Sequence, residues 1–92
     1  MSDVWKWLQA QDEESIIAWA NKGLLRRGQK TLAASPPQLH LEADRASAQI
    51  DGFTQQLNGA GFNHLTCTCP TPGPCHHLCA LLLALKSAAP KQ

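Results

Sequence analysis

Apolar residues follow a helical period in the first third of this chain. Residues 3–11 carry their apolar side chains on one face, and the same spacing resumes after the acidic run at 12–14. We expect Gly23 to interrupt this second pattern, so that one helix ends near Asn21 and another runs from Leu24 to about Ala34. Gly28 lies among leucines of that last helix, where a missing side chain permits close packing.

The period changes to two after the Ser-Pro-Pro run at 35–37, which is expected to stop the helical section. Residues 39–43 and 46–51 alternate apolar and polar side chains, and Gly52 separates them from 53–57. This pattern predicts three short antiparallel strands. A turn at 58–61 and a fourth extended piece at 65–69 follow.

The segment 76–88 carries the strongest helical pattern, because its leucines form one apolar stripe. That stripe consists of Leu78, Leu81, Leu82 and Leu85. The predicted fold class is therefore α+β: amino-terminal helices, a small antiparallel sheet of three to four short strands, and a carboxy-terminal helix. We expect one domain over 1–92, with a helical segment at 1–35, strands at 38–64 and a final unit at 65–88.

Composition supports a globular chain, with 43% hydrophobic and 16% charged residues. Thirteen leucines and thirteen alanines against four β-branched aliphatic residues favour helices over an extensive sheet. The chain shows no apolar run long enough for a membrane span and no signal-peptide pattern, so we expect a cytoplasmic protein that does not associate with membranes. A formal charge of +1 argues against a polycation for nucleic acid.

The four cysteines change this picture, because all lie between Cys67 and Cys79. A disulfide framework joins distant segments, whereas a tight cluster mixed with histidines is more typical of a metal site. Cys67 and Cys69 form one Cys-x-Cys pair, and Cys75 and His77 form a second pair where the last helix begins. Three prolines and a glycine between the pairs favour a tight reversal. The spacing predicts a zinc knuckle that clamps a strand end to a helix start.

This pattern resembles the SWIM-type zinc finger, in which a Cys-x-Cys pair is followed by Cys-x-His and an apolar helix. The resemblance covers about residues 65–85 and implies that Zn²⁺ is held by Cys67, Cys69, Cys75 and His77. A looser likeness at 19–27 to the amino end of longer bacterial SWIM zinc-finger proteins implies that the chain is an amino-terminal domain of such a protein. His76 and Cys79 stay alternative ligands, since Cys79 follows Cys75 by one helical turn.

Catalysis is not expected at this site. A catalytic zinc ion keeps a position open for water and has an acid or base nearby. Here four protein ligands are at hand, and no carboxylate residue follows Asp51. Thiol chemistry at Cys75 beside His76 is the weaker third hypothesis. The sequence indicates no small-molecule substrate.

The basic residues bear on whether the partner is a protein or DNA. Lys22, Arg26, Arg27 and Lys30 form one basic face on the predicted helix. This face would meet phosphates if the chain were a DNA-binding finger, but solvated cations near a helix end are the commoner case. Three thiolates and one zinc ion would lower the formal charge from +1 to about zero. We therefore expect a structural-zinc module that docks a protein partner, with DNA binding as the alternative. The three tryptophans are expected in the core.

Overall fold

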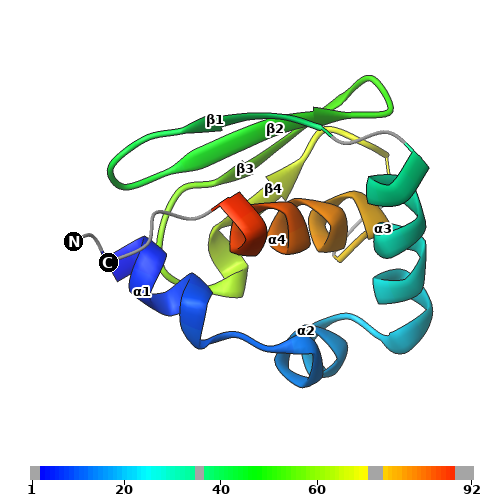
Figure 1. Cartoon of the computed structure of the whole chain (residues 1–92), viewed down its shortest axis with the longest axis horizontal. Helices are drawn as coiled ribbons and strands as arrows, with labels where there is room; N and C mark the ends of the chain where they lie inside the picture. The colour runs from blue at the N-terminus through cyan, green and yellow to red at the C-terminus, as the bar shows by residue number, and fades with distance from the viewer. Residues whose placement is uncertain (1–2, 35–36, 71–73, 89–92) are drawn as a thin grey trace.

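Helices cover one face of a four-stranded antiparallel sheet in the computed structural model, which describes residues 3–34, 37–70 and 74–88 (Figure 1). The helices are α1 (Asp3–Ala10), α2 (Glu13–Trp19), α3 (Lys22–Ala34) and α4 (His76–Ala88), and the strands are β1 (Gln38–Leu41), β2 (Ala46–Ile50), β3 (Phe53–Leu57) and β4 (Leu65–Cys67). The strand order is β1-β2-β3-β4, and each neighbouring pair is antiparallel. The α+β prediction is confirmed. The expected helix stop at 35–37 and the reversal at 70–74 fall partly outside the described residues.

Capping side chains set the starts of α2 and α3. The Asp12 carboxylate accepts a hydrogen bond from the Ser15 backbone N–H at 2.9 Å, and the Asn21 side-chain oxygen accepts one from Leu24 at 2.8 Å. Such bonds satisfy backbone donors that have no partner inside the helix. The prediction that Gly23 breaks the helical pattern is wrong, because the break lies at residues 20–21 and Gly23 lies in the first turn of α3.

The β2–β3 hairpin is closed by a two-residue turn of Asp51 and Gly52. Both residues have positive φ, 54° and 81°, as the type I′ turn requires. This turn explains why β2 ends at Ile50, one residue before the predicted end. It also presents the Asp51 side chain at the end of the sheet near the start of α4, where it contacts His77.

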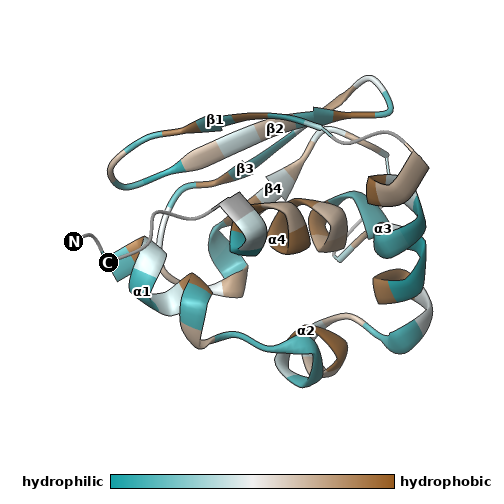
Figure 2. Cartoon of the chain, viewed as in Figure 1, coloured by the Kyte–Doolittle hydropathy of each residue, from teal (hydrophilic) through white to brown (hydrophobic). Residues whose placement is uncertain are grey.

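Helix α4 supplies the centre of the core. Its predicted stripe is confirmed, since Leu78, Leu81, Leu82 and Leu85 are all buried. The helix lies under the sheet with α3 on one side and α1 near its end, and it is the most continuously apolar helix in Figure 2. Burying leucine side chains of this kind stabilises the fold by about 1.5 to 3 kcal/mol each.

Trp5 belongs to the buried core, as predicted, and Trp7 and Trp19 are partly buried against it. Trp5 is only 4% exposed, and its indole N–H lies 3.1 Å from the carbonyl oxygen of Glu42 and 2.9 Å from that of Ala43. Trp7 and Trp19 both pack on Phe62, which lies in a 3₁₀ turn, η1 (Phe62–His64). This turn was not predicted from the sequence.

Candidate metal centre

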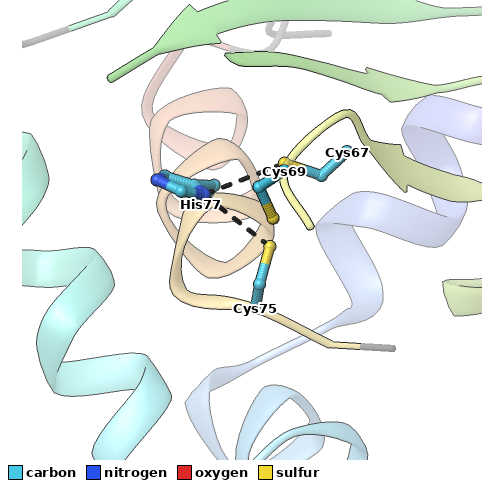
Figure 3. A group of neighbouring side chains, drawn as sticks. All are labelled: Cys67, Cys69, Cys75 and His77. Carbon is cyan, nitrogen blue, oxygen red and sulfur yellow. Dashed lines mark hydrogen bonds between the residues drawn. The ribbon is translucent and has the colours of Figure 1, made fainter. Parts of the chain in front are cut away.

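Four candidate ligands converge at the junction of β4 and α4 (Figure 3). The Sγ atoms of Cys67, Cys69 and Cys75 and a ring nitrogen of His77 all lie within 4.8 Å of one another. His77 Nδ1 lies 3.8 Å from the sulfur of Cys67 and 4.0 Å from that of Cys75. These are the four residues that the sequence predicted as ligands, and the fold brings all of them together.

Strand pairing positions the first cysteine pair. Cys67 is the last residue of β4 and pairs with Gln55 of β3. The ladder continues one residue further, because the Thr68 N–H donates to the Thr54 carbonyl and the Thr68 hydroxyl accepts from the Thr54 N–H, at 3.1 Å and 2.9 Å. Cys69 therefore follows directly after a residue that is still hydrogen-bonded to β3, and this fixes where the chain turns away from the sheet.

The first turn of α4 positions the second pair. The Cys75 carbonyl accepts backbone hydrogen bonds from Leu78 and Cys79, at 3.1 Å and 3.2 Å, which starts the helix immediately after Cys75. His77 is the second residue of α4 and is buried on its inner side. The two ligand pairs thus lie at the end of β4 and at the start of α4, and a shared metal ion would join the two elements.

Burial keeps the metal-free thiol of Cys75 protonated. Cys75 is 2% exposed, and its burial, together with the neighbouring thiols of Cys69 and Cys67, raises the pKa of its thiol to about 12. A thiol of this kind stays protonated near neutral pH unless a cation displaces the proton. Three sulfur donors and one imidazole nitrogen are a donor set that suits Zn²⁺. The residues present therefore fit the ion that the resemblance implies.

Asp51 is a site residue that was not predicted from the sequence. Its Oδ2 atom lies 3.2 Å from Nε2 of His77 and 3.8 Å from Nε2 of His76. It is the last carboxylate residue of the chain, but nothing in the spacing of the cysteines placed it beside the cluster. The signal in the sequence was the Asp-Gly pair between two alternating segments, which is typical of a tight hairpin turn.

Gln55 is a second residue that was not identified from the sequence. Its side chain is fully buried, and its Nε2 atom donates to the Phe53 carbonyl at 2.9 Å and lies 3.4 Å from the sulfur of Cys67. Its Oε1 atom has no hydrogen-bond partner among the described residues. The amide therefore presents its donor side to the metal cluster.

The two alternative ligands lie outside the group of four. Cys79 is fully buried beside α3. Burial raises the pKa of its thiol to about 11. Cys79 therefore packs as a small apolar residue of the core. His76 is partly exposed, and its ring lies tilted by 40° against the ring of His77, with centroids 4.0 Å apart. Burial, and then the neighbouring His77, lower the pKa of His76. His76 forms a separate group with Asp51 and His77 that includes no cysteine.

The predicted basic residues lie on α3 and are exposed. They are Lys22, Arg26, Arg27 and Lys30. Within the described part of the chain, none of the four makes an ion pair within 4.0 Å. Arg27 lies near enough to His76 to contribute to its lowered pKa.

Comparison with known protein families matches residues 49–86 to the SWIM zinc finger. The matched segment begins in β2, includes the whole β2–β3 turn with Asp51 and all of β3 with Gln55, and ends in α4. Searches among curated proteins and among solved structures find no match. None of the helices in the described ranges is long and apolar enough to cross a membrane. The match encloses both candidate ligand pairs, so residues 49–86 are similar to a SWIM zinc finger in sequence and bring together a Cys₃His group that could hold a metal ion.

Proposed function

We propose that this chain is an interaction module whose fold is stabilised by one structural Zn²⁺ ion. The observation that carries the proposal is the convergence of Cys67, Cys69, Cys75 and His77, whose donor atoms lie within 4.8 Å of one another although they come from two elements. The ion would tie the end of β4 to the start of α4. Because α4 is the centre of the core, this tie would support the whole fold.

A structural role is favoured over a catalytic one. Four protein donors complete the tetrahedral shell of Zn²⁺, which leaves no position for a reacting water molecule. Cys75 and His77 are only 2% and 5% exposed, so a substrate has little access to that side of the cluster. We therefore propose that the chain is not an enzyme.

Metal analysis of the purified protein tests the zinc site. We expect one zinc ion per chain, and X-ray absorption should detect three sulfur neighbours and one nitrogen neighbour. Cys75→Ala should abolish tight binding, while Cys79→Ala, which removes an equally buried thiol outside the cluster, should keep one zinc ion. A metal-free protein from chelator-free purification would contradict the proposal, and four sulfur neighbours would replace His77 by Cys79.

Protein is the partner that we propose for this module. The outer face of the sheet, opposite the core, carries no lysine or arginine on the described strands. Its residues on β2, β3 and β4 are Ser47, Gln49, Thr54, Gln56 and Thr66. On the edge strand β1, Gln38 and His40 continue this face. Leu41, which is 40% exposed, pairs with the buried Ala46 and lies on the opposite face. The near-zero formal charge of the zinc-bound form suits a protein partner. Reduced thiols suit the cytoplasm, and the cytoplasmic location stays a prediction.

DNA binding through α3 is the second candidate. The observation that favours it is that Lys22, Arg26 and Lys30 recur every four residues and make no ion pair within the described chain. Titration of the zinc-bound protein with duplex DNA at several salt concentrations tests it. If Arg26 or Lys30 binds a phosphate, its change to glutamine should reduce the salt slope by about one unit. Lys6→Gln, which changes an exposed cation on α1, is the matched control. A salt-independent or absent response would exclude this candidate.

A further inference from the structure

The β2–β3 hairpin contacts two of the four candidate zinc ligands from outside the cluster. Asp51 in its turn contacts His77, and Gln55 in β3 contacts Cys67. One hairpin therefore reaches a member of each ligand pair. Any role of these two residues toward zinc rests on the proposed zinc site.

The contact of Asp51 determines which nitrogen of His77 can bind a metal. An ionised carboxylate only accepts hydrogen bonds, so Nε2, which is 3.2 Å from Asp51 Oδ2, must carry the proton. The unprotonated Nδ1 then faces the sulfurs of Cys67 and Cys75, at 3.8 Å and 4.0 Å. Partners of this kind hold a histidine ligand in one tautomer and one ring orientation.

The contact of Gln55 is fixed by its neighbours in the strand. If the amide were rotated by 180°, its oxygen would lie against the Phe53 carbonyl oxygen at 2.9 Å, where two acceptors repel each other. The nitrogen must therefore occupy that position, and its second hydrogen is directed at the sulfur of Cys67, 3.4 Å away. This orientation leaves Oε1 buried without a partner among the described residues, which is unfavourable. A thiolate at Cys67, which is a stronger acceptor than a thiol, offsets that cost.

We propose that the β2–β3 hairpin is the outer coordination sphere of the zinc site. Asp51 makes His77 an Nδ1 ligand, and Gln55 stabilises the thiolate of Cys67. Both are positioning residues, since neither contributes one of the four donor atoms. Removing either contact should weaken zinc binding about 10- to 100-fold, the usual effect of removing such partners.

Asp51→Gly is the decisive variant. Asp51 is exposed, and glycine accepts the positive φ of 54° at this turn, so the hairpin should keep its shape without the carboxylate. Asp44→Gly, in the loop between β1 and β2, removes a carboxylate that contacts Arg45 and lies outside the cluster, and it is the matched control. Gln55→Met removes the donor while it keeps a buried side chain of similar length.

Zinc dissociation constants from competition with a chromophoric chelator provide the first measurement. We expect about 10- to 100-fold weaker binding for Asp51→Gly and Gln55→Met, and no change for Asp44→Gly. Nitrogen-15 NMR of the zinc-bound wild type provides the second measurement, and should show Nδ1 of His77 bound to the metal and Nε2 protonated. This spectrum tests Asp51 even if Gln55→Met fails to fold.

The outcomes separate this inference from the proposed function. A wild-type chain that takes up no zinc overturns both. One zinc ion per wild-type chain, with Asp51→Gly binding as tightly as Asp44→Gly or with Nε2 of His77 on the metal, overturns the inference alone. The proposed zinc site would then stand.

Discussion

Gly28 of α3 lies directly against the backbone of Ala80 in α4. A β-carbon at Gly28 would come within 2.9 Å of the Ala80 nitrogen, 2.9 Å of the Cys79 β-carbon and 3.1 Å of the His76 carbonyl oxygen. Contacts of this kind are too short for an unstrained side chain, so the two helices meet backbone to backbone. The helix that carries the basic residues is therefore held on the turn of α4 that contains His77.

Gly28→Ala should destabilise the protein. Alanine favours a helix over glycine by about 1 kcal/mol, but the clash with α4 forces the helices apart at a cost of about 1 to 3 kcal/mol. Gly23→Ala is the matched control on the same helix, since its β-carbon would meet only the Asn21 side-chain oxygen at 3.4 Å. Urea unfolding should show a lower free energy of unfolding for Gly28→Ala than for the wild type, and no decrease for Gly23→Ala. Equal stability of the two variants would contradict the close contact.

Removal of zinc should loosen the junction of β4 and α4 before the rest of the fold. Residues 65–70 and the first turn of α4 depend on the four ligands, whereas Leu81, Leu82 and Leu85 are buried in the core. Hydrogen exchange after chelation should show early loss of amide protection at Cys79 and in β4. Protection at Leu85 should persist longer, because its amide lies deep in the core helix. Uniform protection with and without zinc would speak against a structural ion.

Trp5→Phe should cost about 1 to 2 kcal/mol of unfolding free energy. The change keeps an aromatic ring but removes the indole donor that serves the carbonyl groups of Glu42 and Ala43. Trp7→Phe is the control, because the Trp7 ring packs on Phe62 and makes no hydrogen bond through its indole nitrogen within the described chain. Thermal unfolding of the zinc-bound proteins compares the two. A larger decrease in stability for Trp7→Phe than for Trp5→Phe would show that the lost ring volume costs more than the lost hydrogen bonds.

Neutralising the exposed cations of α3 should leave the fold unchanged. Arg26, Arg27 and Lys30 make no ion pair in the described structure, so changing each to glutamine should alter the unfolding free energy by no more than about 0.5 kcal/mol. Zinc content and thermal unfolding of the triple variant measure this. If a cellular partner no longer binds while both measurements stay unchanged, the basic face is an interaction surface. A loss of stability would instead reveal a structural role.

The sequence by itself determined the features that depend on local spacing. The leucine stripe of α4 and the alternation of β2 are periodic within a few residues, and they matched the structure because burial follows the same periods. The two ligand pairs were predictable for the same reason, since Cys67 and Cys69, and Cys75 and His77, are close neighbours in the chain. The start of α3 was misplaced because helix propensity pointed to Gly23, while the capping bond from Asn21 decided the boundary.

Only the tertiary structure decided what surrounds the candidate ligands. Asp51 is 26 residues from His77 in the chain, and Gln55 is 12 residues from Cys67. The Asp-Gly pair marks the turn between β2 and β3, but no local pattern specifies the register of β3 on β4 or the packing of that turn against the start of α4, and these close both distances. The contact of Gly28 with Ala80 likewise depends on how α3 crosses α4. Local periodicity chooses which face of an element is buried, but the partner that covers this face is set by the packing of the whole chain.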